Sequence, residues 1–216
     1  MGGQMKGKLI LENGMSFEGK IFGELGEAVG ELVFNTGMTG YQELLTDPSY
    51  CGQIVVMTYP MIGNYGINLE DMESSKIHLK GFVIKEDAKL PNNFRCEMTL
   101  DGFLRQNKVV AFKGVDTRQL TKIIREEGAM KAIITSKDLT QKEIDEHFGK
   151  FCNKDAVSKV STKEIYEIPG TGKRIGVINT PVYPHPVFPH PPFRTVCRSA
   201  RFLCGHALAR INTQRY

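Results

Sequence analysis

Several features that mark other protein classes are missing from this 216-residue sequence. It has no run of about 18 apolar residues, so we expect no transmembrane helix. Its opening, MGGQMKGKLI, lacks the apolar core and cleavage site of a signal peptide. Its five cysteines are odd in number and form no C-x-x-C pair, which favours reduced thiols over a disulfide framework. The sequence therefore predicts a cytoplasmic globular chain, with one domain or one domain plus a fragment.

Acidic side chains are absent after Glu167, and this absence divides the chain by charge. Of the 28 lysines and arginines, seven follow Glu167, so residues 1–167 hold 21 basic groups against all 24 acidic ones, a net charge of −3. The formal net charge of +4 is thus a property of the C-terminal stretch. It gives no argument for a nucleic-acid-binding domain.

Strand and turn patterns dominate the first half of the chain. Two apolar runs, KLILE and SFEGKIFGE, flank Asn13-Gly14, and an Asn-Gly pair between such runs predicts a β-hairpin. A short helix is possible at 41–46. Further strands are expected at GELVFN (30–35), IVVMTYP (54–60) and IHLKGFVIKE (77–86).

Strands and helices alternate in the second half. Asp116 is placed to N-cap the helix TRQLTKIIREE, which Gly128 would end, and Thr140 with Glu143 forms a capping-box pattern that opens another helix. A helix at 99–107 and strands at VVAFKGV (109–115) and KAIITS (131–136) complete the pattern. The predicted class is α/β, a mixed α+β fold with a β-rich N-terminal half and a layered sheet packed with helices.

Composition also predicts the domain division. We expect a domain over 1–152, a linker over 153–173, and RIGVIN (174–179) as the first strand of a second domain. Residues 180–192 hold six of the ten prolines, which can neither donate to a sheet ladder nor continue a helix. The Pro/Arg-rich tail, 180–216, is therefore expected to be disordered or aberrant.

Two segments carry a resemblance to a known family: VFNTGMTGYQELLTDPSYCGQIVVMTYPMIGNYGIN (33–68) and FKGVDTRQLTKIIREEGAMKAII (112–134). They resemble the small subunit of glutamine-dependent carbamoyl-phosphate synthase, and the similarity runs from about Lys6 to Asn179. The resemblance implies an N-terminal domain that packs on the large subunit, where ATP and Mg are used, followed by a class I amidotransferase domain. In that second domain a cysteine activated by a histidine hydrolyses glutamine, and the ammonia passes to the large subunit for carbamoyl phosphate synthesis.

Ser49 is the one site residue that the resemblance transfers to this chain. In the family, the serine of the LTDPSY segment contributes to glutamine binding, and a hydroxyl on a turn after proline suits a polar substrate. From the residues alone, a local turn cap is the simpler interpretation. No cofactor is assigned to this chain.

After Asn179 the sequence departs from the family. The family continues with an aspartate and a helix, and later carries its nucleophile in a Cys-Leu-Gly-His-Gln segment, whereas a proline tract follows here. An amidotransferase domain would need roughly 180 residues. The segment Leu203-Cys204-Gly205-His206 matches the nucleophile segment only superficially, so no catalytic residue is assigned.

A metal site is not predicted either. Cys197, Cys204 and His206, with His185 or His190, match no common zinc spacing. The stretch Asp116, Thr117 and Arg118 is explained as the start of a helix and receives no catalytic role.

Two function classes remain open. One is a small-subunit N-terminal domain, truncated or read out of frame after Asn179, that docks on the large subunit but cannot hydrolyse glutamine. The other is a non-catalytic assembly or regulatory module whose Pro/Arg tail is a recognition segment of the polyproline kind. Nucleic acid is a weaker third partner class, and no membrane partner is expected. The sequence does not decide between arginine and pyrimidine biosynthesis.

Overall fold

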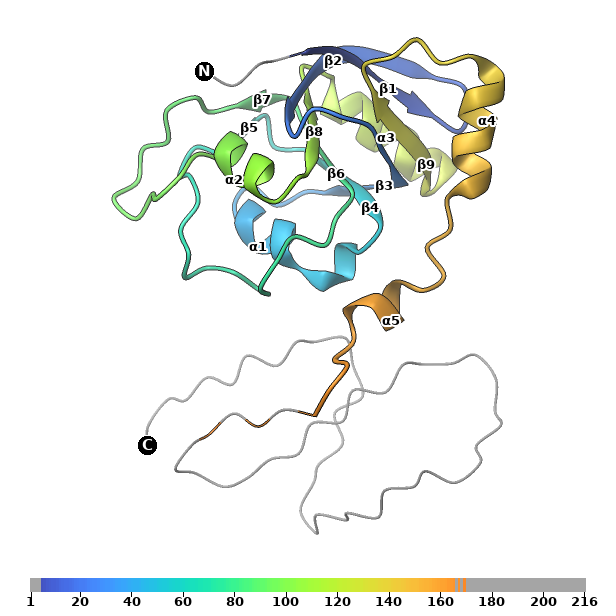
Figure 1. Cartoon of the computed structure of the whole chain (residues 1–216). Helices are drawn as coiled ribbons and strands as arrows, with labels where there is room; N and C mark the ends of the chain where they lie inside the picture. The colour runs from blue at the N-terminus through green and yellow to red at the C-terminus, as the bar shows by residue number, and fades with distance from the viewer. Residues whose placement is uncertain (1–4, 166, 168, 170–216) are drawn as a thin grey trace, which may run out of the picture. The chain divides into compact units, whose positions relative to one another are not determined.

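The computed structural model describes residues 5–165, 167 and 169. Within this range, seven strands close into a barrel in the order β1–β2–β8–β6–β4–β3–β9 (Figure 1). Their bounds are β1 Met5–Leu11, β2 Ser16–Gly23, β3 Ala28–Asn35, β4 Gln53–Met57, β6 Gly81–Ile84, β8 Val110–Lys113 and β9 Met130–Thr135. The neighbours β3, β4, β6 and β8 run parallel, and the other pairs are antiparallel.

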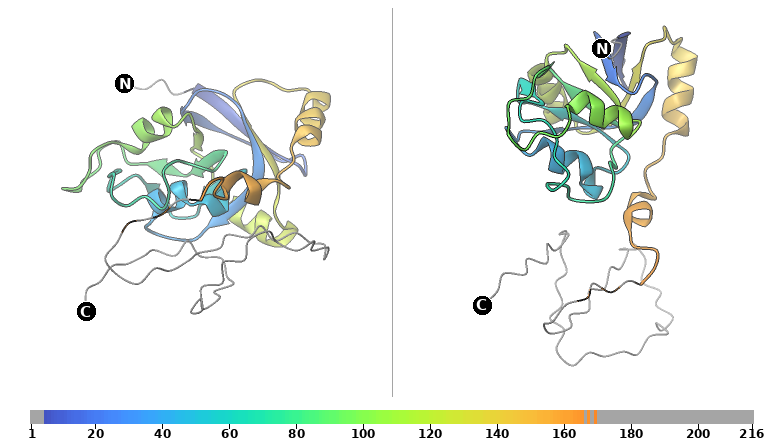
Figure 2. Two further views of the ribbon diagram at one scale, coloured as in Figure 1. Left: turned by 60° about the horizontal axis from the view of Figure 1, so that its bottom comes forward. Right: turned by 60° about the vertical axis from the view of Figure 1, so that its left-hand side comes forward.

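The remaining elements lie around this barrel. Two short strands, β5 (Met61–Ile62) and β7 (Glu86–Asp87), form a small parallel sheet of their own. The helices are α1 Tyr41–Thr46, the 3₁₀ turn η1 Pro48–Tyr50, α2 Leu100–Gln106, α3 Thr117–Glu127, α4 Gln141–Lys150 and α5 Ala156–Val160. Helix α4 packs on β9, and in each view it lies apart from α1 and α2 (Figures 1 and 2).

Alternate residues of the central strands face two separate cores, because successive side chains of a strand point to opposite sides. On β4, Ile54 and Val56 belong to the barrel interior, whereas Val55 and Met57 belong to an outer core under α1 and α2. Both layers are buried, which explains why β6 and residues 54–57 of β4 are apolar rather than alternating. Helix α3 adds Leu120, Ile123 and Ile124 to the interior core.

The locally specified elements match their predictions. The Asn13-Gly14 hairpin forms with Leu9 opposite Phe17. The Asp116 carboxylate accepts from the backbone N–H groups of Arg118 and Gln119, and Gly128 follows α3 with φ of 89°. Thr140 and Glu143 form the reciprocal capping box of α4, and hydrogen bonds from Thr140 lower the pKa of the Glu143 carboxyl. The mixed class with a strand-rich N-terminal part is confirmed.

Three features differ from the sequence-based expectations or extend them. The sheet closes into a barrel, which no local pattern indicated. The strand expected over 77–86 begins only at Gly81, which pairs with Ile54; before it, the Lys80 N–H donates to the Gln53 carbonyl. A five-residue helix, α5, lies inside the segment expected to be a linker.

The packing divides the chain after Val160. Of the second unit, only residues 161–165, 167 and 169 are described. The strand predicted at 174–179 and the tail at 180–216 lie outside the described residues, so the domain division stays a prediction. No helix in the described part of the chain has the length and apolar character needed to cross a bilayer.

Candidate functional site

Ser49 lies in the one-turn helix η1, between α1 and β4. The Asp47 carboxylate accepts a hydrogen bond of 2.8 Å from the Ser49 backbone N–H, and Pro48 occupies the first position of the turn. Asp47 is therefore the cap of this turn, as expected for an Asx turn. The Ser49 side chain is exposed, and its hydroxyl has no hydrogen-bond partner within the described residues. The hydroxyl is thus open to an external partner.

The turn is tied to the end of β3 by its tyrosine. The Tyr50 hydroxyl accepts a hydrogen bond of 3.0 Å from Asn35 Nδ2, while Asn35 Oδ1 accepts from the Gly37 N–H at 2.7 Å. Cys51 closes the turn by donating its N–H to the Pro48 carbonyl at 3.1 Å. These bonds hold the backbone on both sides of Ser49.

Helix α1, which leads into this turn, is capped by a distant residue. Gly40 stands at its N-cap with φ of 80° and has no side chain to accept a bond. Instead, the Tyr65 hydroxyl accepts from the backbone N–H groups of Gly40 and Tyr41, at 2.8 and 3.1 Å. The Tyr41 hydroxyl in turn donates to the Gly66 carbonyl at 2.6 Å, and the two rings stack with centroids 4.2 Å apart. Burial raises the pKa of both hydroxyls.

Gln42 is buried, and its side-chain amide forms two hydrogen bonds with the backbone of one residue, Asn68. Its Nε2 donates to the Asn68 carbonyl, and its Oε1 accepts from the Asn68 N–H at 3.0 Å. One helical turn later, Thr46 Oγ1 accepts from the Glu73 N–H at 2.9 Å, and the Thr46 carbonyl accepts from the Ser74 hydroxyl at 2.6 Å. These polar side chains brace α1 against the 64–74 loop.

The segment GMTGYQELLTDPSY therefore contains two kinds of residue. Tyr41, Gln42 and Thr46 are at most 1% exposed and hold the fold together. Ser49 is exposed and unbonded within the described residues. Sequence reasoning missed the bracing role of Gln42 and Thr46. Their spacing of four residues places them on the same face of a short helix, but this spacing does not identify the residues that they bond to.

The second family-like segment begins at a buried ion pair. Lys113 Nζ lies 2.5 Å from Asp87 Oδ1, with the two side chains 9% and 16% exposed, and 4.8 Å from the centre of the Phe22 ring. Thr117 is also buried, and its hydroxyl has no partner among the described residues. Asp116 and Arg118 are exposed at the start of α3. This end of the segment joins β7 to β8.

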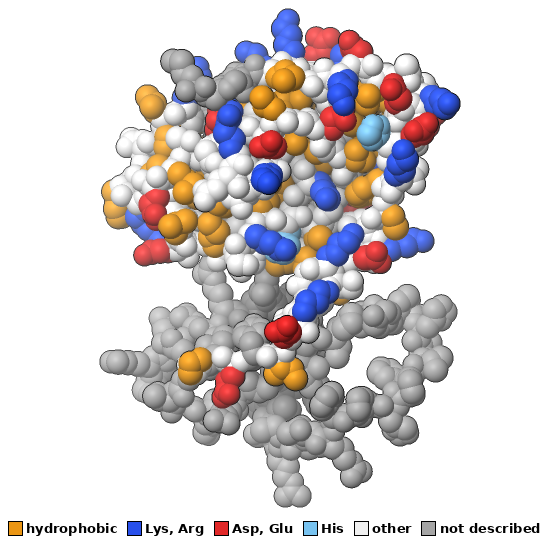
Figure 3. Space-filling model, viewed as in Figure 1, with side chains coloured by type: hydrophobic (Ala, Val, Ile, Leu, Met, Phe, Trp, Pro, Cys, Tyr) orange, Lys and Arg blue, Asp and Glu red, His pale blue; other side chains and the backbone are white. Residues whose placement is uncertain are grey.

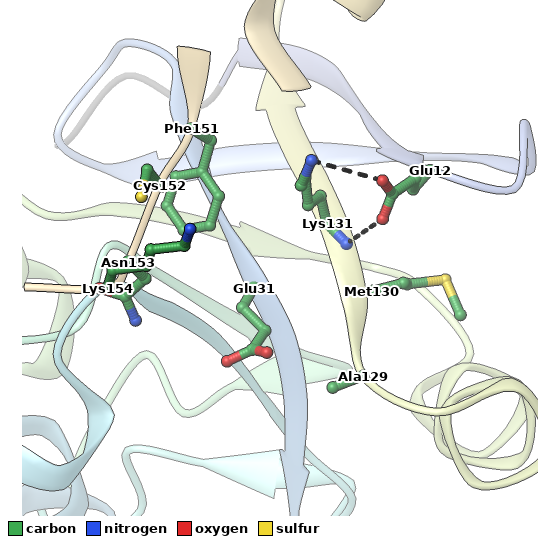
Figure 4. A pocket seen from close by; sticks show the side chains of 9 residues that line it. All are labelled: Glu12, Glu31, Ala129, Met130, Lys131, Phe151, Cys152, Asn153 and Lys154. Carbon is green, nitrogen blue, oxygen red and sulfur yellow. Dashed lines mark hydrogen bonds and ion pairs between the residues drawn. The ribbon is translucent and has the colours of Figure 1, made fainter. Parts of the chain in front are cut away.

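A hollow of about 490 Å³ lies between strands β3 and β9 and the segment that follows α4 (Figure 4). Its lining residues are Glu12, Glu31, Ala129, Met130, Lys131, Phe151, Cys152, Asn153 and Lys154. Lys131 is already engaged: its backbone N–H donates to Glu12 at 3.0 Å, and its Nζ lies 3.5 Å from Glu12 and 3.0 Å from the Phe148 carbonyl. Among the described residues that line the hollow, no histidine accompanies Cys152, so no cysteine–histidine pair is formed there.

Cysteine pairs, metal sites and charged patches are other features that could indicate a function in the described part of the chain. Cys51, Cys96 and Cys152 are free there, and the described residues contain no group of three histidine, cysteine or acidic side chains placed to hold a metal. On the face shown in Figure 3, basic and acidic side chains are interspersed. The residues weighed for a metal or nucleophile in the tail, from His185 to His206, lie outside the described residues.

Comparisons with known proteins agree on one family. The family model described as "Carbamoyl-phosphate synthase small chain, CPSase domain" matches residues 9–134. The carbamoyl phosphate synthase small chain of Clostridium perfringens (strain 13 / Type A) is 59% identical over 175 residues, covering 81% of this chain and 50% of its own length. The pyrimidine-specific small chain of Bacillus subtilis (strain 168) is 49% identical over 176 residues, covering 81% and 48%.

The chain thus spans about half the length of the curated relatives it matches. Among solved structures, an aminopeptidase from Aneurinibacillus sp. strain AM-1 aligns with a TM-score of 0.33 and 15% identity, over 62% of this chain and 33% of its own. A likeness at that level carries no weight for fold or function.

Proposed function

The chain belongs to the carbamoyl-phosphate synthase small-chain family, and from this premise we propose that its barrel is the domain that docks a small chain on the large subunit of the synthase. The observation that carries the proposal is the extent of the family match. Residues 9–134 begin within β1 and end within β9, so the family's domain and the closed barrel coincide.

The proposed reaction is shared between chains. The small subunit supplies ammonia from glutamine, and the large subunit uses ATP and Mg to make carbamoyl phosphate, so this chain needs no cofactor of its own. Its 216 residues contain no Cys-Leu-Gly-His-Gln segment. We therefore expect the chain, taken alone, to bind the large subunit without hydrolysing glutamine. Arginine and pyrimidine biosynthesis are both compatible with this role.

Ser49 is proposed as a glutamine contact in the complete small subunit. Two observations support this role: Asp47 supplies the cap of η1, which frees the Ser49 hydroxyl, and that hydroxyl is exposed. A free hydroxyl can both donate to and accept from the polar groups of an amino-acid substrate.

Docking is tested by titrating the purified large subunit with the 216-residue chain, using calorimetry and size-exclusion chromatography. A stoichiometric complex is expected. The matched control is the same chain without residues 180–216, which we expect to bind equally well. Loss of binding in the shortened chain, with the barrel still folded, would favour the alternative in which the Pro/Arg tail is the recognition segment. Absence of binding by both folded chains would overturn the proposal.

Chemistry is tested separately by a glutaminase assay on the same chain. No turnover is expected. Turnover that Cys204→Ser abolishes would overturn the assignment of no catalytic cysteine. In a complete small chain of the family, alanine in place of the LTDPSY serine should raise KM for glutamine about tenfold, which corresponds to one lost hydrogen bond. Synthesis from free ammonia should not change.

A further inference from the structure

Asn153 links the end of the barrel domain to the turn that carries Ser49. It follows α4 by three residues, and its Nδ2 donates a hydrogen bond of 2.8 Å to the Cys51 carbonyl, 102 residues away in sequence. Cys51 is the residue whose own N–H closes η1. The Asn153 side chain therefore holds the turn at the residue where it ends.

Gly52 provides the space for this contact. It is buried with φ of +82°, and a Cβ built on it would lie 2.1 Å from Asn153 Oδ1. No side chain larger than hydrogen fits there while Asn153 stays in place. On its other side, the Gly52 carbonyl accepts from the Glu31 N–H at 3.3 Å. Gly52 is thus held between β3 and Asn153.

The same asparagine precedes the next helix and is hydrogen-bonded to its first residue. Its backbone carbonyl accepts from the Ala156 N–H at 3.2 Å, in the first turn of α5. Asn153 lies at the edge of the hollow in Figure 4, between Cys152 and Lys154. One residue therefore contacts the Ser49 turn through its side chain and α5 through its backbone.

We propose that Asn153 is a positioning residue for the glutamine contact: it anchors the Ser49 turn to the start of α5 and so sets the turn's conformation. This inference rests on the proposed function of Ser49. It assigns Asn153 no contact with substrate and no part in bond making.

Amide hydrogen exchange on the full 216-residue chain tests the anchor. In Asn153→Ala, we expect the Tyr50 and Cys51 amides to exchange about fivefold faster, because one hydrogen bond that supports the closed turn is lost. Asn153→Asp keeps the size but loses the donor, so it should behave like the alanine variant. Asn92→Ala, at an exposed asparagine, is the matched control and should leave both amides unchanged. Unchanged exchange in Asn153→Ala would overturn the proposal.

A double-mutant cycle supplies a second readout. Gly52→Ala should destabilise the chain both through its positive φ and by displacing Asn153. In the Asn153→Ala background the displacement disappears, so the cost of Gly52→Ala should become smaller. An equal cost in both backgrounds would show that the two residues are not coupled and would overturn the anchor.

These measurements use neither glutamine nor the large subunit. A negative result would remove the anchor and leave the proposed function standing. Conversely, if alanine in place of the LTDPSY serine leaves the KM for glutamine of a complete small chain unchanged, the proposed glutamine contact is wrong. The exchange data would still test the anchor in that case.

Discussion

The segments around α1 and α3 both carry polar residues in a family-like pattern. The hydrogen-bond partners of those residues lie at different distances along the chain. Around α1, Gln42 bonds to Asn68, and the Tyr65 hydroxyl caps the helix from 24 and 25 residues away. Around α3, Asp116 accepts from N–H groups two and three residues onward. Helix α3 therefore carries most of its specification locally, whereas α1 depends on the 64–74 loop.

The largest loss of stability is expected at a contact of the α3 segment that, unlike its helix cap, joins distant residues. Lys113 begins the α3 segment, yet its partner Asp87 is 26 residues away. Asp87→Ala should lower the free energy of unfolding by about 3–5 kcal/mol, because it leaves a buried ammonium unpaired. Glu126→Ala, which breaks the exposed pair with Lys122, should cost less than about 0.5 kcal/mol. Urea unfolding followed by circular dichroism measures both, and equal costs would contradict the prediction.

Gln42→Met tests the α1 side of the contrast. The methionine fits a similar volume but removes both hydrogen bonds to Asn68, whose backbone groups are then left buried and unpaired. The expected loss is about 2–3 kcal/mol. Gln119→Met on the exposed face of α3 is the control and should change stability by no more than about 0.5 kcal/mol. A Gln42 variant as stable as the wild type would show that the brace is not needed.

Tyr65→Phe removes the distant cap while keeping the stacked ring. Two N–H groups at the start of α1 lose their acceptor, and we expect a loss of about 1–2 kcal/mol in the same unfolding assay. Faster amide exchange should be confined to α1 and the 64–74 loop. Equal acceleration in α3 would mean that the two segments are not independent.

Alkaline pH should weaken the α1 region. Burial raises the pKa of Tyr41 in the folded chain, whereas an unfolded tyrosine ionises near pH 10. The folded state binds the proton more tightly, so its stability is fully present below about pH 10 and falls as pH rises above that value. Tyr41→Phe cannot titrate and should show a shallower fall. Parallel pH curves for the two proteins would argue against the prediction.

Asp116→Ala should have the smallest effect of the set, about 1 kcal/mol, because it removes one helix cap. Asp116→Asn, which keeps a capping oxygen, should restore most of the stability. Unfolding measurements on both variants decide this. A cost above that of Gln42→Met would reverse the order of local and distant contributions.

Prediction from sequence succeeded where a few neighbouring residues decide the structure. The Asn13-Gly14 hairpin, the Asp116 cap, the Gly128 end of α3 and the Thr140–Glu143 box all formed as expected. Closure of the barrel was not predicted, since β9 pairs with both β1 and β3 and no local pattern names those partners. Ser49 was identified through the family resemblance, and its contact with glutamine stays a prediction.

The sequence by itself determined the mixed fold class, the caps and turns, and the family to which the chain belongs. Each of these depends on residue types at short, fixed spacings. Only the tertiary structure decided that Tyr65 caps α1 and that Gln42 pairs with Asn68. The same holds for the hydrogen bond from Asn153 to the Cys51 carbonyl. The physical reason is that the type of a polar side chain gives its hydrogen-bond donors and acceptors but does not identify its partner. Tertiary packing brings together residues that are far apart in the sequence, 24 positions for Tyr41 and Tyr65 and 102 positions for Cys51 and Asn153.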